Sequence, residues 1–567
     1  MKSLAHVFAL LFAIGLFCGP VLASWSIASG NYLAIGGLLP WSDASGWFTG
    51  AIHLLSYGSL DWWTTRRPLN PAFLGTLFLV AGQNLKGLLL LQASLVGVAC
   101  FLATREIGRT FGVAASLLAF AVLMSFGARF VSTTLSESLG LLFGGTGFAL
   151  MWRAVLRQEP MVYSFGLFML TLGLSARPGP LLVLPALALW ASFGFSVTAR
   201  GMNARPFELA CLGVLAGGAV TMFLTSIHGS DAGAPGANYS YVLYGLAHGG
   251  KQWTQVFIDH PEWSTLTEAA LAKLTYRAAL TEISENPGNF LSGLWLFGKS
   301  YLSNLFSYVS PVLRAPILTL SGIGFAFAVI ECRRRIPSFL LAGVLGVVAS
   351  APVLFYDADA YRTFVATVPF DAALAALGLA VVIKVLQSAV YRDEGFHYDR
   401  AAHGYSGAVA LGVLLTFVCT VGLAMAIAAY RTPRFAVTAC PSGLSSTIIQ
   451  LGRTSPYITI RADDVDNESF APNVGLADFR RDESFANVEI GAILANLSPG
   501  TTLIEGWDLS ARQEGKLAPR WVVATGNWVL QEGRYYQICG LRKSVRYQGG
   551  SVSMMEAEVV REVSPLR

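Results

Sequence analysis

The stretch LAHVFALLFAIGLFCGPVLAS, residues 4–24, decides the fold class because it contains no Asp, Glu, Lys or Arg. A helix needs about 20 mainly apolar residues to cross the hydrocarbon core of a bilayer. Similar runs recur along the chain. They predict about eleven transmembrane helices, at residues 4–24, 85–104, 112–128, 137–155, 161–176, 179–197, 207–226, 313–331, 337–355, 364–387 and 406–430.

The composition of the whole chain leads to the same class. Of the 567 residues, 54% are hydrophobic and only 13% are charged, and the mean hydropathy is +0.55. These values exclude a soluble globular protein. The net charge of +5 comes from short basic segments between the apolar runs, so it does not indicate a nucleic-acid partner.

The basic segments fall in alternate connections between the predicted helices. Examples are Lys2, Arg105, Arg153, Arg200 and Arg333. By the positive-inside rule these connections are cytoplasmic, so the N-terminus is inside and the tail after residue 430 is outside. We expect a multi-pass protein of the bacterial inner membrane.

Two apolar segments need separate interpretations. Residues 72–82 are too short to span and follow two prolines, so we expect a re-entrant or interfacial piece. The end of the first run, Val21-Leu22-Ala23-Ser24, also fits a signal-peptidase site, and its cleavage would leave the topology of the rest unchanged.

The first outer loop, residues 25–84, contains an isolated carboxylate at Asp43. Residues 44–57 have the spacing of an amphipathic helix in the membrane interface, with tryptophans as anchors. Asp43 would stand at the N-terminal end of this helix, where the helix dipole favours an ionised carboxylate. It is either a functional acid or simply the N-cap of the helix.

Two arginines, Arg66 and Arg67, precede Pro68 where the chain returns to the membrane. The planar guanidinium fork binds phosphate oxygens in pairs, so these residues are candidate phosphate ligands. The alternative is that they contact anionic lipid headgroups.

Further charged residues lie on the same predicted outer side. Glu137 opens a span and is either an ordinary helix-terminal acid or part of the same site. Arg177, in a tight outer turn, opposes the positive-inside bias and should have a partner. In the long outer loop 227–311, Lys251 follows glycines and aromatic residues that suit a phosphate and a sugar or isoprenoid, although a surface lid is an equal alternative.

The segment Tyr356–Arg362 is unusually rich in charge for a membrane edge. Tyr361 and Arg362 are candidates for binding the phosphate, and an ion pair of Arg362 with Asp357 or Asp359 is the alternative. Asp371, further into the following span, should be paired or protonated.

The order of these motifs resembles the GT-C superfamily of integral-membrane glycosyltransferases, which includes aminoarabinose, protein O-mannosyl and arabinofuranosyl transferases. The motifs are Ser42-Asp43-Ala44, Arg67-Pro68-Leu69-Asn70-Pro71, Glu137, Arg177-Pro178 and Tyr361-Arg362, within residues 1–430. The resemblance implies a GT-C-like catalytic domain that takes a sugar from a polyprenyl-phosphate donor at the outer face.

In that resemblance Asp43 is the general base, and Arg66, Arg67, Arg177, Lys251 and Arg362 hold the leaving phosphate. One base implies inversion at the sugar carbon. The acceptor would be a glycolipid, a polysaccharide or a protein of the cell envelope. Asp43 lacks the adjacent second acid of some members, and no Asp/His set at metal-ligand spacing accompanies it. We therefore expect no catalytic metal and no other cofactor.

The tail, residues 431–567, changes to polar sequence with short β-branched runs and predicts a small outer β-rich domain. Its cysteines, Cys440 and Cys539, could form a disulfide or remain free thiols. Two other functions stay open from the sequence: a flippase, polymerase or transporter of lipid-linked sugars, and a non-catalytic envelope assembly protein.

Overall fold

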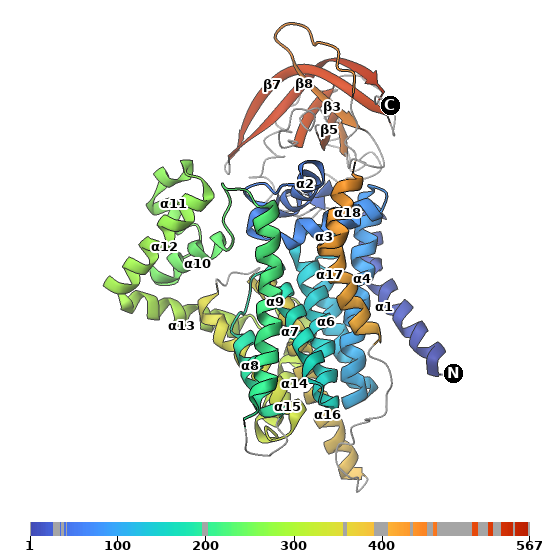
Figure 1. The fold of residues 1–567 in the computed structure, drawn as a ribbon, viewed down its shortest axis with the longest axis vertical. Coiled ribbons are helices and arrows are strands. Elements are labelled where there is room, and N and C mark those ends of the chain that lie inside the picture. The colour runs from blue at the N-terminus through green and yellow to red at the C-terminus, as the bar shows by residue number, and fades with distance from the viewer. Residues whose placement is uncertain are drawn as a thin grey trace.

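The computed structural model describes residues 2–26, 34–35, 39–40, 42–195, 202–354, 360–390, 406–430, 435–450, 458–461, 502–507, 520–525, 534–547 and 550–564. Figure 1 shows a long helical bundle, a lateral group of helices and a β-sheet beyond one end of the bundle. The predicted fold class, a polytopic helical membrane protein with a small β-rich tail, is confirmed.

Within the described residues, seven helices are long and apolar enough to cross a membrane, or eight if one bent pair counts as a single span. The seven are formed by α1 (Lys2–Ser26), α4 (Leu85–Phe111), α6 (Ser136–Arg157), α9 (Ala204–His228), α14 (Pro311–Ile330), α15 (Arg335–Ser350) with the 3-10 helix η3 (Ala351–Val353), and α16 (Val368–Val390) with the 3-10 helix before it. The bent pair is α17 (Ser406–Cys419) and α18 (Val421–Ala429), which meet at 43°.

Three of the eleven predicted spans form apolar helices of fewer than 18 residues, which are not counted among the seven. They are α5 (Val113–Gly127), α7 (Pro160–Ala176) and α8 (Val183–Gly194). Gly112, with a positive φ of 92°, ends α4 and starts α5, and Pro160 stands in the first turn of α7. The full count of eleven transmembrane helices therefore stays a prediction.

The predicted outer loop folds into short helices at the sheet end of the bundle (Figure 1). They are α2 (Ser42–Tyr57), the 3-10 helix η1 (Thr64–Arg66) and α3 (Leu69–Val80). The helical prediction for residues 44–57 is confirmed by α2. However, α2 buries Trp47, Phe48, Leu54 and others in the main core, and α3 is buried from Leu69 to Phe78. Both helices therefore pack against the core of the bundle, and the re-entrant or interfacial placement of residues 72–82 stays a prediction.

The loop 227–311 forms the lateral unit of helices, which we define as residues 237–303 (Figure 1). It contains α10 (Ala237–Ala247), α11 (Gln255–Asp259), η2 (Pro261–Thr265), α12 (Glu268–Glu285) and α13 (Pro287–Ser303). A small hydrophobic core of its own, including Tyr244, Val256 and Ala279, holds it together.

The tail forms a six-stranded sheet in the order β3-β7-β8-β6-β5-β4. The strands are β3 (Ser445–Gln450), β4 (Ile458–Arg461), β5 (Thr502–Trp507), β6 (Arg520–Thr525), β7 (Tyr535–Tyr547) and β8 (Gly550–Val563). Neighbours run antiparallel except β6 and β8. A two-stranded sheet of β1 (Ala34–Ile35) and β2 (Leu39–Pro40) precedes α2. In the structure Cys440 and Cys539 form a disulfide with Cα atoms 5.6 Å apart.

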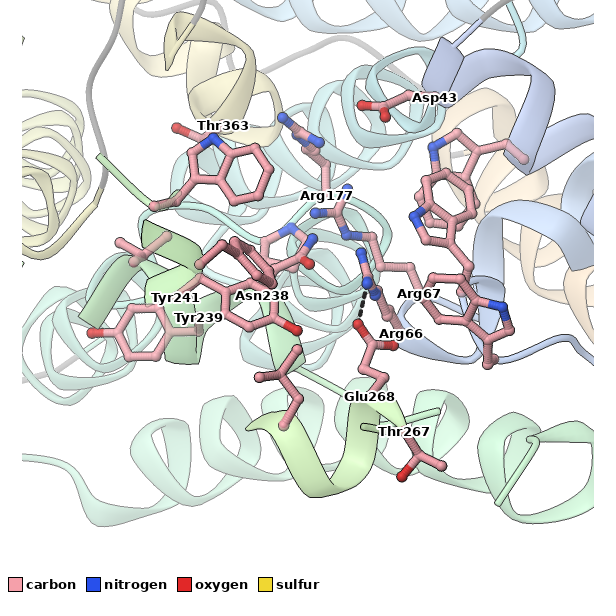
Figure 2. Close-up of a pocket in the computed structure, with 18 of the residues that line it drawn as sticks. Asp43, Arg66, Arg67, Arg177, Asn238, Tyr239, Tyr241, Thr267, Glu268 and Thr363 are labelled. Carbon is pink, nitrogen blue, oxygen red and sulfur yellow. Dashed lines mark ion pairs between the residues drawn. The ribbon is translucent and has the colours of Figure 1, made fainter. Parts of the chain in front are cut away.

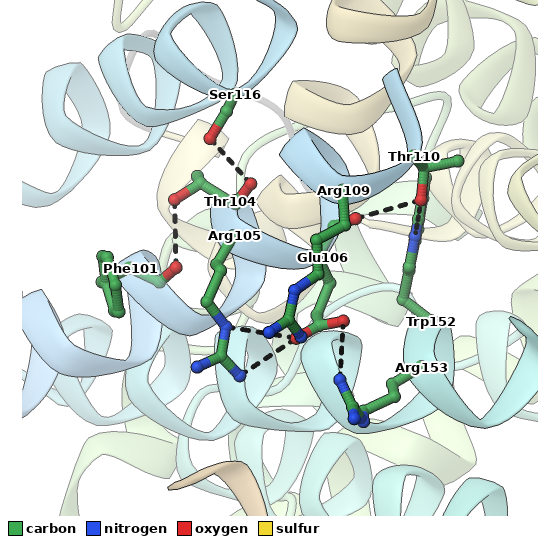
Figure 3. A network of polar contacts seen from close by, with 9 residues as sticks. All are labelled: Phe101, Thr104, Arg105, Glu106, Arg109, Thr110, Ser116, Trp152 and Arg153. Carbon is green, nitrogen blue, oxygen red and sulfur yellow. Dashed lines mark hydrogen bonds and ion pairs between the residues drawn. The ribbon is translucent and has the colours of Figure 1, made fainter. Parts of the chain in front are cut away.

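The end of the bundle far from the sheet carries a buried charge cluster (Figure 3). The Glu106 carboxylate, 2% exposed, accepts hydrogen bonds from Arg105, from Arg109 at 2.7 Å and from Arg153 at 3.4 Å. Trp152 Nε1 donates to Thr110 beside it. The predicted cytoplasmic arginines thus gather around one acid from α4, which the sequence analysis did not single out.

Candidate functional site

A cavity of about 950 Å³ opens at the sheet end of the bundle. Its charged lining residues are Asp43, Arg66, Arg67, Arg177, Arg362 and Glu268, and its tryptophans are Trp47, Trp62, Trp63 and Trp253. In the view of Figure 2 the labelled arginines lie between Asp43 and Glu268. The structure therefore brings together five of the residues that the sequence predicted as site residues, from segments far apart in the chain.

Asp43 occupies the first turn of α2, which begins at Ser42. An N-cap residue stands just before the first helical residue, whereas Asp43 lies inside the helix. The side chain is 50% exposed, and its Oδ2 atom lies 3.8 Å from Arg362 Nη2. Asp43 is thus an accessible carboxylate beside a fixed cation.

Glu137, in the first turn of α6, is fully buried and does not line the cavity. Its Oε1 atom lies 2.5 Å from Arg362 Nε and 3.6 Å from Arg177 Nε. Both arginines line the cavity in front of it. Glu137 therefore positions the two guanidinium groups from behind, and the predicted direct contact of Glu137 with a substrate is not what the geometry offers.

Arg362 belongs to the 3-10 helix η4 (Ala360–Thr367), which packs closely against α6. Gly144 of α6 makes this approach possible, and Gly179 lets the turn between α7 and α8 approach η4 in the same way. A Cβ atom on Gly144 would collide with the backbone of Ala366, and one on Gly179 with the backbone of Thr363. Only glycine leaves that space, so the chain brings η4 close enough for Arg362 to reach Glu137.

Tyr361, the neighbour of Arg362, points away from the cavity lining. Its hydroxyl accepts a hydrogen bond of 2.9 Å from Arg129, and its ring packs against Phe126 and Tyr308. Tyr361 thus anchors η4 and is not a substrate ligand in this geometry. Arg129 was missed from the sequence, although its place at the predicted outer end of residues 112–128 opposes the positive-inside bias, as that of Arg177 does.

Arg66 and Arg67 enter the cavity from η1 and the residue after it. Arg66 forms an ion pair with Glu268 at the start of α12, drawn in Figure 2, and its guanidinium lies 5.4 Å from the Trp62 ring centre. Arg67 lies 5.6 Å from the Trp47 ring centre. Burial, and then the nearby Arg177, lowers the pKa of Arg67. A buried cation among cations gains most from an added anion.

Glu268 was also missed from the sequence. It lies within a segment predicted only as helical, and its partner Arg66 is about two hundred residues away, so no local pattern pairs them.

Lys251 lies outside the cavity. The lining residues do not include it, and its side chain is exposed. The amide N–H groups of Gly250 and Lys251 both donate to Gly245 O, so these donors are already used within the turn. The glycine-lysine segment is a tight turn after α10, and the structure does not bring Lys251 together with the arginines of the cavity. Of the segment 356–362, Asp357 and Asp359 lie outside the described residues.

Metal ligation was assessed across the described ranges. Those residues contain no group of three or more His, Cys, Asp or Glu side chains placed to hold a metal ion. The expectation of a metal-independent reaction stays a prediction.

Comparisons with known proteins add little. No family model matches the chain, and no curated protein matches it. Among solved structures, the archaeal oligosaccharyltransferase AglB from Archaeoglobus fulgidus, in complex with an inhibitory peptide and a dolichol-phosphate, is 11% identical with a TM-score of 0.39, over 75% of this chain and 56% of that one. The oligosaccharyltransferase of the same organism with Zn and sulfate is 12% identical with a TM-score of 0.39, over 74% and 52%. This chain spans about half the length of either protein, and its function must be inferred from its own site.

Proposed function

We propose that this chain is a membrane glycosyltransferase that moves a sugar from a polyprenyl-phosphate donor to a hydroxyl group of a cell-envelope acceptor. The observation that carries the proposal is the lining of the large cavity: one accessible carboxylate, Asp43, faces a group of arginines. A base beside a cluster of cations suits a reaction in which one oxygen loses a proton and a phosphate departs.

In this mechanism Asp43 accepts the proton of the acceptor hydroxyl. The acceptor oxygen forms a bond to the anomeric carbon, and the bond from that carbon to the phosphate oxygen breaks. The electron pair of the broken bond leaves with the polyprenyl phosphate. Arg362 and Arg177, held by Glu137, and Arg67 then stabilise the phosphate. A single displacement of this kind inverts the anomeric carbon.

The acids of the cavity agree with an inverting reaction. Glu268, the other carboxylate among the lining residues, is paired with Arg66 and therefore not placed as a nucleophile. Trp47 and Trp63, whose ring centres are 4.3 Å apart, both line the cavity and supply aromatic surface against which a sugar ring can pack.

We further propose that this cavity faces the outer side of a bacterial inner membrane, with the sheet domain in the periplasm. The buried arginine cluster around Glu106 lies at the other end of the bundle and fits the cytoplasmic side. The acceptor would then be a glycolipid, a polysaccharide or a protein of the envelope.

A transporter or flippase would need polar groups along a path through the membrane. The central helix α6 has no charged side chain along most of its length. Glu137 stands at one end and Arg153 near the other, and the residues between them carry no charge. By the rise of an α-helix this gap is about 24 Å. The separation favours the transferase over the transporter.

The proposal is tested by replacing Asp43 with Asn in the purified full chain and measuring transfer from polyprenyl-phosphate sugars to envelope extracts. We expect a loss of at least about a hundredfold in rate. Asp231→Asn is the matched control, because Asp231 is exposed and does not line the cavity. If Asp43→Asn transfers sugar at the wild-type rate, Asp43 is not the general base. If the wild-type chain transfers no sugar from any such donor, the proposal that it is a glycosyltransferase fails.

A further inference from the structure

The lateral unit contains a second cavity of about 350 Å³. It lies between the end of α10, η2 and the C-terminal half of α12. None of its lining residues belongs to the large cavity. The small cavity is therefore a separate site, and the proposed transfer reaction gives it no role.

The two cavities lie in series along the same pair of helices. On α10, Tyr241 lines the large cavity and Tyr244 lines the small one. On α12, Glu268 lines the large cavity and Thr281 lines the small one. These two residues of α12 are about 20 Å apart along the helix axis. The nearest lining residues of the two cavities on α12, Leu271 and Leu274, are about 4.5 Å apart along the axis. A ligand that fills both cavities therefore extends along the helices.

Flat aromatic groups form two walls of the small cavity. The rings of Tyr244 and His248 stack with centres 4.1 Å apart. Those of His260 and Trp263 stack at 3.8 Å and within 5° of parallel. The Tyr244 hydroxyl is fixed by Asp259 at 3.0 Å, and Gln255 holds Asp259 in turn. Rigid aromatic faces of this kind bind flat, partly apolar rings at little entropic cost.

The polar lining groups are mixed in sign. Arg277 supplies donors, Glu282 supplies acceptors and Thr281 supplies a hydroxyl. Apart from the imidazoles of His248 and His260, the lining has one guanidinium and one carboxylate, whose formal charges cancel. Such a lining suits a neutral ring with many hydroxyl groups better than a phosphate or a carboxylate.

From these observations we infer that the small cavity is a saccharide subsite, which binds a neutral sugar residue of an extended glycan while the end of that glycan occupies the large cavity. The inference rests on the proposed function only in calling this glycan the acceptor. The acceptor is then an oligosaccharide or a polysaccharide, and a single small molecule is excluded as the acceptor.

The test is direct binding of the purified full chain to an array of neutral tetrasaccharides of glucose, galactose, mannose and rhamnose, with acidic oligosaccharides and peptides on the same array. We expect binding to at least one neutral tetrasaccharide, weakened about tenfold or more by Trp263→Ala and by Arg277→Ala. Trp295→Ala and Lys273→Ala are the matched controls. Both side chains are exposed on the same unit, outside the cavity, and both variants should bind as the wild type does.

Failure of this inference is distinct from failure of the proposed function. Equal binding by all four variants, no saccharide binding, or binding of peptides alone would overturn the subsite. Asp43→Asn should lose transfer and keep saccharide binding. If Asp43→Asn transfers sugar as the wild type does while Trp263→Ala still loses binding, the base assignment fails and the saccharide subsite stands.

Discussion

Arg362 Nε lies 2.5 Å from Glu137 Oε1, although the two residues are 225 positions apart in the chain. The same arginine places Nη2 at 3.8 Å from Asp43. One guanidinium thus connects a fully buried acid of the core to the accessible acid of the cavity. The position of the candidate base and the packing of α6 are therefore coupled through a single side chain.

Glu137→Gln should destabilise the protein and lower transfer together. Removing one partner of a buried pair leaves the other charge uncompensated, at a cost of about 3–5 kcal/mol. Thermal unfolding of the purified protein in detergent measures this loss of stability. Glu331→Gln is the control: Glu331 pairs with Arg334 at 2.8 Å in a more exposed place, where a pair contributes about 0–1 kcal/mol. Equal shifts of the unfolding temperature in the two variants would contradict a stabilising role of the buried Glu137 carboxylate.

Arg362→Lys should keep the charge and lose most of the rate. Lysine has no planar fork, so it does not hold Glu137 and the cavity at once. We expect a fall of about 10²–10³-fold in kcat, the scale of losing one fixed donor at a developing charge, with a smaller change in KM for the donor. Steady-state kinetics measure both. A change confined to KM would mean that Arg362 serves only ground-state binding.

Gly144→Ala should reduce transfer without touching any charged group. The added methyl meets the backbone of Ala366 and displaces η4, which carries Arg362. A displacement of about 1 Å at a reacting site costs about a hundredfold in rate. Gly218→Ala is the control because a Cβ there meets nothing within 4 Å. If both variants transfer normally, η4 does not set the site geometry.

Treatment with a chelator should leave transfer unchanged. The mechanism assigns charge stabilisation to Arg67, Arg177 and Arg362, all of which line the cavity. The measurement is initial rate before and after dialysis against EDTA, with and without added Mg²⁺ or Mn²⁺. Loss on dialysis and recovery on adding a metal would overturn the metal-independent reaction.

Replacing both Cys440 and Cys539 by Ser should loosen the sheet domain. The disulfide closes a segment with a separation of 99 residues, and loss of such a bond costs about 2–5 kcal/mol. Limited proteolysis of the tail is the measurement, and Cys332→Ser, at an exposed free cysteine, is the control. Equal proteolysis of both variants and the wild type would show that the bond adds no stability.

The sequence predicted which residues share a face of the membrane, and that was enough to group Asp43, Arg67, Arg177 and Arg362. The sequence did not predict in which direction each side chain points around its helix axis. Glu137 therefore appeared as a possible ligand, although α6 turns it behind the arginines. Apolar runs and the positive-inside rule predict a side of the bilayer, but they do not predict which charge stands in front of another.

Long-range pairs were also beyond the sequence. Glu268 and Arg129 gain their roles from partners in distant segments, Arg66 and Tyr361. Lys251 was grouped with the site from the sequence but does not line the cavity. The glycine turn beside it, which looked suited to a phosphate, uses its own N–H groups in hydrogen bonds within the turn. Local chemistry indicated the residue types of the site, and tertiary contacts decided which of them meet.

The uncharged length of α6 has an electrical consequence. A charge that crosses a membrane under a potential of 100 mV gains or loses about 2.3 kcal/mol. In this molecule the acids and arginines of the cavity stay at one end of the helix, and those around Glu106 stay at the other. A proton passed to Asp43 and a phosphate released beside it travel no distance through the field, so sugar transfer would run at the same rate in energised and in de-energised vesicles.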